Sequence, residues 1–344
     1  MKGKQLLIAA LALFLSSFAI AQETTEFVPS GKASGKVFFN YHYDMTSGEE
    51  QESSFEIKRS YLGYDYNIAK GFKASITLDV GKNDGGSDYT AYLKKAQLEW
   101  TMSPVVKVSL GMISTIQFKE QEKFWGYRYI RKSFADEFGF ESSADVGVKA
   151  KFKISDSFSV NAIIMNGEGY KNLQDEDGKQ KIGASLVYEN KGLLAKVYGS
   201  VLSTSVADEI GNEEDVTSSS IATFIGYKFS DQFKLGAEYN LLTNATKYSS
   251  TAKDKDMTGL SFYSTYTFNE KWEVFGRYDK LSSNTLKGES EKWNLANNGG
   301  AITTGVQYAP VRGVKMALNY QGYNFKDSNN EDNSLVFVNF EFKF

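Results

Sequence analysis

Long stretches of the chain alternate apolar and polar residues with a period of two. In segment 72–80 every second residue is apolar: Phe72, Ala74, Ile76, Leu78 and Val80. Segment 145–154 repeats the pattern, with Lys149, Lys151 and Lys153 on its polar face. Successive side chains of a β-strand point to opposite faces, so this pattern predicts strands with one apolar and one polar face.

Sixteen such segments follow one another along the chain. They lie near 35–43, 54–66, 72–81, 91–102, 105–113, 145–154, 158–166, 180–189, 193–203, 219–229, 233–243, 257–268, 272–281, 300–308, 314–323 and 334–344. Most match the roughly 9–11 residues that a tilted strand needs to cross a bilayer, and an even number is typical of bacterial outer-membrane barrels. We therefore predict an all-β fold, a 16-stranded antiparallel transmembrane β-barrel.

The connections between these segments alternate between short and long. Tight turns such as 103–104 and 190–192 alternate with longer polar connections such as 204–218 and 282–299. Short periplasmic turns and long extracellular loops are typical of outer-membrane barrels. A single alternating segment would equally suit a soluble sandwich. The alternation of short and long connections over the whole chain favours the barrel.

One segment departs from regular alternation. In 54–66, Phe55 and Ile57 share one parity, whereas Leu62, Tyr64 and Tyr66 share the other. A β-bulge shifts the facing of a strand by one residue. We therefore expect a bulge or register change between Ile57 and Leu62.

The last segment places Val336, Val338, Phe340, Phe342 and Phe344 on one face. An apolar strand ending on Phe344 resembles the terminal signature that the barrel-assembly machinery recognises, so we expect that machinery as a partner. As the sixteenth strand it should pair with segment 35–43 and remove the open edge of the sheet.

The N-terminal residues have the features of a secretory signal. Lys2 and Lys4 precede an apolar run, and Ala19-Ile20-Ala21 is a small-x-small cleavage pattern. We expect a signal peptide over 1–21, a short periplasmic segment over 22–34 and an outer-membrane barrel over 35–344. The predicted location is the outer membrane of a Gram-negative bacterium, in contact with its lipid and lipopolysaccharide.

Composition agrees with this class of fold. Aromatic residues make up 15% of the chain and prolines number only 3, and aromatic girdles flank the apolar band of membrane barrels. The chain contains no cysteine, so thiolate metal sites and a cysteine nucleophile are excluded. With 42 acidic against 39 basic residues it lacks the basic excess of nucleic-acid-binding proteins. We expect no cofactor, no metal site and no catalytic residue.

The longest connection, 114–144, is unusually aromatic for a surface loop. It contains Phe118, Phe124, Trp125, Tyr127, Tyr129, Ile130, Phe134, Phe138 and Phe140. Long loops in compact proteins are usually functional, and a barrel of sixteen strands encloses an aqueous channel. We expect this third long loop to fold inward and narrow the lumen. The alternative is an external cap or a contact between copies of the chain, in which the aromatic residues pack on a neighbour.

Basic residues in this loop and on the wall are candidates for anion binding, since rings of Arg and Lys favour anions. The candidate constriction residues are Lys119, Lys123, Tyr127, Arg128, Tyr129, Arg131 and Lys132. The candidate lumen-wall residues are Arg59, Lys73, Lys95, Lys107, Lys149, Lys151 and Lys153. Lys149, Lys151 and Lys153 would follow one another about 6.6 Å apart, as a rail for small anionic solutes. Ion pairing with neighbouring strands is the alternative role for each lysine.

Three stretches resemble the phosphate-selective porin O/P family of Bacteroidota-like chains. They are 55–64, the combination of 110–113 with 124–128, and 142–147. The resemblance implies a sixteen-stranded passive channel, a homotrimer, and a preference for anions set by the third loop and the inner wall. The chain lacks the arginine ladder of that family and offers three lysines in its place.

Two other classes of function compete with a channel. A barrel-wall hydrolase would need a general base, and the single histidine, His42, falls on the first predicted strand without a recognisable serine motif. A structural or adhesive barrel would use acidic external loops such as 208–215, for which solvated charge is the simpler explanation. An energy-coupled receptor would need a plug larger than the few residues before the first strand.

Overall fold

The computed structural model describes residues 27–48, 52–83, 85–174, 176, 178–207 and 211–344. The predicted signal peptide and part of the predicted periplasmic segment lie outside these residues. Among the residues described, no helix is long and apolar enough to cross a membrane.

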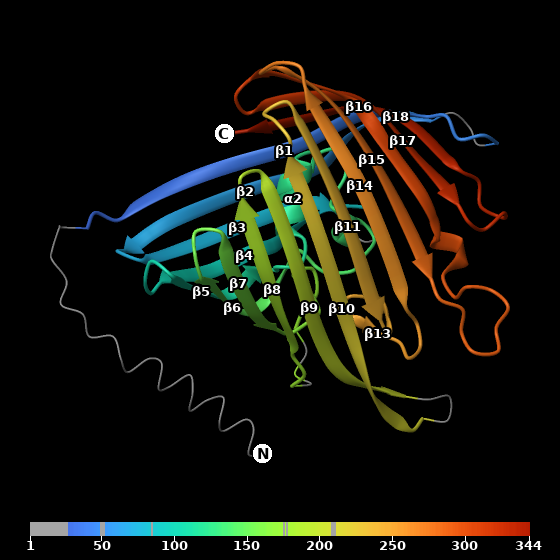
Figure 1. The fold of residues 1–344 in the computed structure, drawn as a ribbon, viewed down its shortest axis with the longest axis horizontal. Coiled ribbons are helices and arrows are strands. Elements are labelled where there is room, and N and C mark those ends of the chain that lie inside the picture. Colours follow the sequence, from blue (N-terminus) through green and yellow to red (C-terminus); the bar gives the residue numbers. More distant parts are fainter. Residues whose placement is uncertain (1–26, 49–51, 84, 175, 177, 208–210) are drawn as a thin grey trace.

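Sixteen antiparallel strands form a closed barrel (Figure 1). Their bounds are β1 Ser30–Asp44, β2 Ser53–Ala69, β3 Phe72–Lys82, β4 Tyr89–Thr101, β5 Val106–Ser114, β6 Ala144–Lys153, β7 Phe158–Met165, β8 Lys181–Asn190, β9 Leu193–Ala207, β10 Glu213–Lys228, β11 Phe233–Thr243, β14 Met257–Thr267, β15 Trp272–Ser283, β16 Gly299–Val311, β17 Val314–Phe325 and β18 Asn333–Lys343. This confirms the predicted fold class. Each strand pairs with its neighbours in chain order, and β18 closes on β1.

The closing pair is in the predicted place. Val37 lies opposite Phe342 and Tyr43 lies opposite Val336. β1 begins at Ser30, earlier than the alternating pattern predicts, and β9 and β10 extend through most of the predicted loop 204–218. Polar residues of these extensions still pair in the ladder, as Thr204 does with Val216, so hydrogen bonding continues the strands beyond the apolar alternation.

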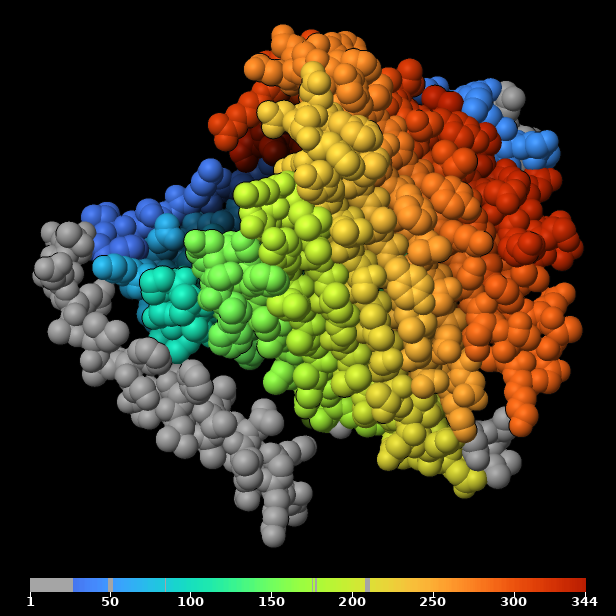
Figure 2. Space-filling view, viewed as in Figure 1, coloured from blue at the N-terminus to red at the C-terminus, as the bar shows by residue number. Residues whose placement is uncertain are grey.

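The distribution of side chains is the reverse of that in a soluble protein. On β8, Ser185 faces inward and is 3% exposed, whereas the neighbouring Leu186 is 47% exposed. The strands present a continuous outer wall (Figure 2), on which Ile182, Val197 and Leu318 are also exposed. Apolar side chains on the outside and polar ones inside are expected of a barrel that lies in lipid.

Two β-bulges interrupt the register within the β1–β4 wall, and a further irregularity between Asn67 and Ala69 lies next to the β2–β3 turn. Phe38 lies opposite Arg59 and Phe39 opposite Ile57, so Lys58 is the extra residue of β2. Likewise Thr77 lies opposite Lys95 and Leu78 opposite Leu93, so Lys94 is the extra residue of β4. The first bulge confirms the predicted irregularity in 54–66.

The remaining elements belong to connections. α2 Lys119–Trp125 and α3 Phe134–Glu137 lie between β5 and β6, η1 Leu295–Asn297 lies between β15 and β16, and the small hairpin of β12 Ala245–Lys247 with β13 Ser250–Thr251 lies between β11 and β14. α2 lies within the ring of strands (Figure 1).

Candidate functional site

The connection 115–143 folds into the barrel, as its aromatic content predicts. Its two ends are held together where β5 and β6 meet, because Thr115 donates hydrogen bonds from its backbone N–H to the Ser143 carbonyl (3.2 Å) and from its hydroxyl to the Ser142 carbonyl (2.5 Å). Nearer β6, the buried Glu141 pairs with Lys181 of β8 at 3.1 Å and accepts a hydrogen bond from Tyr198 of β9. We call residues 115–143 the inserted loop.

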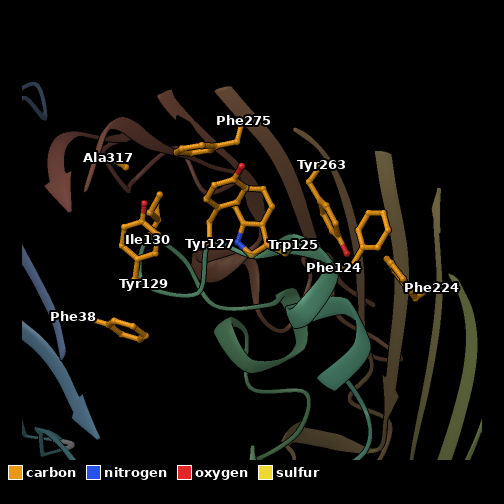
Figure 3. Close-up of a cluster of buried hydrophobic side chains, with 10 residues drawn as sticks. All are labelled: Phe38, Phe124, Trp125, Tyr127, Tyr129, Ile130, Phe224, Tyr263, Phe275 and Ala317. Carbon is orange, nitrogen blue, oxygen red and sulfur yellow. The ribbon is translucent and has the colours of Figure 1, made fainter. Parts of the chain in front are cut away.

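Aromatic packing anchors the inserted loop to the inner wall (Figure 3). The Trp125 ring is 1% exposed and lies 5.4 Å from the ring of Tyr263 on β14 and 5.9 Å from that of Phe275 on β15. The Tyr127 ring packs against that of Phe275 at a tilt, with centroids 4.4 Å apart. Inward-facing aromatic wall positions, which a water-filled lumen would expose, are thus covered by the loop.

Polar contacts fix the orientation of the same segment. The Tyr127 hydroxyl donates to Glu273 and the Tyr129 hydroxyl donates to Gln307, both at 2.9 Å. The indole N–H of Trp125 donates to the Arg131 carbonyl at 3.1 Å. Tyr127 and Tyr129 are therefore buried anchors of the loop, and neither lines an open space.

A second cluster holds the α3 part of the loop. Phe134 and Phe140 are fully buried against Leu242 and Met257. The wall residue opposite is Gly259, where a Cβ atom would collide with the Phe134 ring. A glycine in a strand permits this close approach.

The basic residues of the inserted loop are mostly paired with acids. Arg128 pairs with Glu122 at 2.8 Å and with Asp136 at 3.1 Å, and Lys132 lies 3.9 Å from Asp136. Arg131 lies 3.3 Å from Asp279 of β15 and 3.8 Å from Glu137. Lys119 and Lys123 have exposed side chains and no ion pair in the part of the chain that the structure describes.

Neighbouring charges shift the titration of these loop residues. Burial raises the pKa of Glu122, and the nearby Arg128 only partly offsets that rise. Burial disfavours the charge of Arg128, but Asp136, Tyr61 and Glu122 outweigh it and hold the pKa above its usual range. Burial likewise opposes ionisation of Glu137, yet Arg131, Lys132 and Lys58 lower its pKa to about 2. Glu137 is therefore a carboxylate at neutral pH.

A cavity of about 690 Å³ lies between the inserted loop and the β1–β4 wall. Its lining contains one acidic side chain, Glu122, and eight basic ones: Lys32, Lys36, Lys94, Lys95, Lys119, Arg128, Arg312 and Lys343. Arg312 belongs to the short turn between β16 and β17, so this cavity reaches the turn end of the barrel. We call it the basic cavity.

Two of these lysines have acidic partners on the wall. Lys94 lies 3.2 Å from Asp79, which also pairs with Arg59 at 3.1 Å and accepts a hydrogen bond from Tyr170 at 2.7 Å. Lys95 lies 3.9 Å from Asp65, whose side chain is 46% exposed. Lys32, Lys36, Lys119, Arg312 and Lys343 have no ion pair with another described residue. Their positive charge is therefore directed at the solvent of the cavity.

The predicted wall residues differ in their surroundings. Arg59 is tied to Asp79, Lys73 lies 3.1 Å from Asp65, and Lys107 lies 2.9 Å from Glu99. Lys149 donates to the Ser114 carbonyl, Lys153 pairs with Asp156 in the adjacent turn, and Lys151 between them is exposed. The three lysines of β6 share a face but have different contacts. Of the predicted wall residues, only Lys95 lines the basic cavity.

A second, smaller pocket of about 310 Å³ opens at the opposite end of the lumen. It is lined by Arg131, Glu137 and Phe138 of the inserted loop, and by wall residues that include Gln321, Tyr323 and Phe337. Phe325 and Asn333, which flank the long connection 326–332, also line it. We call it the aromatic pocket.

His42 has a serine partner that the sequence did not reveal. The ring nitrogens lie 3.3 Å from the Ser54 hydroxyl and 3.4 Å from the Asn40 side-chain oxygen. Ser54 is opposite His42 in the β1–β2 register. Around His42 the β1 backbone is paired on both sides, with β2 and with β18, so its N–H groups are not free to bind an oxyanion.

No group of three or more His, Cys, Asp or Glu side chains among the described residues is arranged to hold a metal ion. The buried carboxylate of Asp79 is satisfied by Arg59, Lys94 and Tyr170.

The chain is similar to proteins of known class. A family model described as "Putative beta-barrel porin-2, OmpL-like" matches residues 34–344, whereas no protein of curated function matches. Among solved structures, the outer membrane channel DcaP of Acinetobacter baumannii is 13% identical with a TM-score of 0.68, over 94% of this chain and 100% of that one.

Two further solved structures share the fold. An anion-selective porin from Comamonas acidovorans is 14% identical, with a TM-score of 0.67 over 92% of this chain and 100% of that one. OmpT of Vibrio cholerae in its trimer form is 14% identical, with a TM-score of 0.59 over 92% and 100%. At such identities the likeness concerns the fold alone.

Proposed function

The chain belongs to the OmpL-like β-barrel porin family and resides in the outer membrane, and from this premise we propose that it is a diffusion porin with a mild preference for anions. The observation that carries the preference is the composition of the basic cavity, in which eight basic side chains face one acidic side chain. Basic residues lining a pore attract anions and repel cations.

We place the selective part of the proposed route beside the inserted loop. Lys119 and Arg128 reach the basic cavity from the loop, and Lys94 and Lys95 reach it from β4. Of these, Lys119 has no ion pair with any residue that the structure describes and Lys95 has only a long one, so we assign selectivity chiefly to these two lysines. Several weak basic sites, rather than one tight site, allow an ion both to enter and to leave.

Phosphate preference is a narrower proposal, and it rests on the resemblance of 55–64, 110–113 with 124–128, and 142–147 to phosphate-selective porins. The basic cavity suits a multivalent anion in charge, but Lys149 and Lys153 of the predicted rail are engaged elsewhere. We therefore propose general anion preference first.

A homotrimer is supported by the trimer form recorded for the similar OmpT of Vibrio cholerae.

The experiment is a reversal-potential measurement in planar bilayers across a KCl gradient. A Lys95→Gln/Lys119→Gln variant should lose at least half of the wild-type preference for chloride over potassium, because two of the least neutralised cations of the cavity are gone. Lys271→Gln, in the exposed turn between β14 and β15, is the matched control and should behave as wild type. Cation selectivity of the wild type would contradict the anion preference, and absence of conductance would contradict the porin.

The contact of His42 with Ser54 raises barrel-wall hydrolysis as a second candidate. A serine hydrolase needs a nucleophile, a base and donors for the oxyanion, and the paired backbone around His42 offers no such donors. A fluorogenic ester tests it: turnover by the wild type that His42→Ala abolishes would support hydrolysis, and equal background rates would exclude it.

A further inference from the structure

The aromatic pocket is an unexpected feature of a barrel interior. Lumen-facing positions of such barrels are normally polar, and the inward aromatic residues Phe224, Tyr263 and Phe275 are explained because the inserted loop buries them. Tyr323, Phe325 and Phe337 also line the lumen side, yet each is only partly buried. These rings are only partly covered, because Phe138 of the inserted loop contacts Tyr323 and His42 contacts Phe337. Exposed apolar surface of this kind usually marks a binding site.

The rings form a continuous row. Phe325 and Tyr323 follow each other on one face of β17 with centroids 4.6 Å apart, and Phe138 of the inserted loop continues the row 6.3 Å from Tyr323. The row therefore runs from the long connection 326–332 inward to the loop. At its inner end the Arg131 guanidinium lies 5.8 Å from the Phe138 ring centroid.

Polar groups with hydrogen-bonding capacity surround the rings. Gln321 donates its amide to Asn319, so its side-chain oxygen remains an acceptor without a partner among the described residues. Glu137 contributes a carboxylate and Arg131 a guanidinium, which lie 3.8 Å apart and are not in close hydrogen-bond contact. Asn333 adds an exposed amide. Both donors and acceptors thus reach the same 310 Å³ space.

We propose that the aromatic pocket is a binding site for neutral hydroxylated rings, that is, for a saccharide of one or two units. The apolar C–H face of a pyranose packs on aromatic rings, while its hydroxyls take hydrogen bonds from amides, carboxylates and guanidinium groups. The volume lies at the lower end of ordinary ligand pockets, and aromatic walls with a few polar groups are their usual lining.

The geometry favours a saccharide over a flat aromatic solute. The planes of Phe138, Tyr323 and Phe325 are tilted by 49° at each step, so they form a curved surface and not a parallel-sided slot. A puckered ring follows such a surface. The pocket also differs from the basic cavity in place and charge, so the inference goes beyond anion passage and holds whether or not anions are preferred.

Ligand-observed NMR on the detergent-folded protein tests this site without requiring conduction. Glucose and its acyclic counterpart sorbitol are the probes, because both are six-carbon polyols of similar size but only glucose has a ring face. Glucose should bind with a Kd in the millimolar range and sorbitol at least tenfold more weakly. Equal binding of the two, or binding of benzyl alcohol but not glucose, would overturn the proposal.

Two variants locate the site. Tyr323→Ala should weaken glucose binding at least tenfold, whereas Tyr323→Phe, which keeps the ring and removes only its hydroxyl contact with the Asn297 carbonyl, should retain most of it. Phe325→Ala, at the partly exposed outer end of the row, provides a second test with little risk to folding. Lys271→Gln, in the exposed turn between β14 and β15, is the control and should leave glucose binding unchanged. Unaltered binding in both alanine variants would overturn the assignment.

Discussion

The side-chain ammonium of Lys58 donates a hydrogen bond of 2.9 Å to the backbone carbonyl of Ile130. Lys58 is the extra residue of the bulge in β2, and Ile130 is a fully buried residue of the inserted loop. An irregularity of the wall is thus tied directly to the loop that narrows the lumen, and the contact spans 72 residues of sequence.

Lys58→Met should loosen this attachment. Hydrogen bonds to charged groups contribute about 1.5 to 3 kcal/mol, so the free energy of unfolding in urea should fall by about that amount. Single-channel conductance should rise or become noisier because the loop is less constrained. Lys70→Met, in the exposed turn between β2 and β3, serves as the control because Lys70 does not line the basic cavity. Wild-type conductance and stability of Lys58→Met would show that the tether has no mechanical role.

The two bulges explain which site residues the sequence could not reveal. Alternation correctly assigns Arg59 and Lys95 to the lumen face, but a bulge places an additional neighbour, Lys58 or Lys94, on that side. Strict period-two counting assigns those neighbours to lipid. The mixed parity of 54–66 indicated the first bulge. The second has the same kind of signal, since Leu93 has one parity and Leu98 and Trp100 the other, but it was not predicted.

The inserted loop illustrates a different limit. Its aromatic content predicted that it would fold against the inner wall, and the structure confirms this. The partner residues, such as Tyr263 and Phe275, come from strands far away in sequence. Tyr127 and Tyr129 were candidate constriction residues because of their neighbours Arg128 and Arg131, yet packing buries the two rings. Which side of a loop faces the wall depends on tertiary contacts that spacing does not encode.

Trp125→Ala tests the aromatic anchor. Removing a fully buried Trp side chain costs about 3 to 5 kcal/mol, and it also removes the hydrogen bond to the Arg131 carbonyl. We expect an unfolding midpoint at lower urea and a larger conductance, as the loop leaves the wall. Trp272→Ala, at a 44% exposed outward position, is the matched control and should change conductance little. A channel of wild-type size in Trp125→Ala would mean that other contacts suffice to hold the loop.

Asp79 organises the wall beside the basic cavity, since its fully buried carboxylate contacts Arg59, Lys94 and Tyr170. Asp79→Asn leaves two partly buried cations without their counterion, and breaking such a pair costs about 3 to 5 kcal/mol. The unpaired charge of Lys94 should also increase anion preference in reversal-potential measurements.

Asp65→Asn is the control for the stability measurement. Its carboxylate is 46% exposed and pairs with Lys73 and Lys95, so its loss should cost less than about 1 kcal/mol. Equal destabilisation by the two substitutions would contradict the assigned role of burial.

Glu122 should make anion preference depend on pH. It is the single acidic side chain in the lining of the basic cavity, and burial raises its pKa above the ordinary glutamate value of 4.5. As the pH falls, Glu122 therefore takes up a proton earlier than an exposed glutamate, and the cavity loses its negative charge. Anion preference should consequently increase on acidification, starting above the range in which exposed glutamates titrate.

Glu122→Gln removes that titration. The variant should already have increased anion preference at neutral pH, and the part of the rise that begins above the ordinary glutamate range should be absent. Glu120→Gln is the matched control from the same helix, because Glu120 is paired with Lys196 on β9 and does not line the cavity. Reversal potentials recorded between pH 4 and 8 distinguish the cases. If wild type and Glu122→Gln follow the same curve, the charge that governs selectivity lies elsewhere than in the basic cavity.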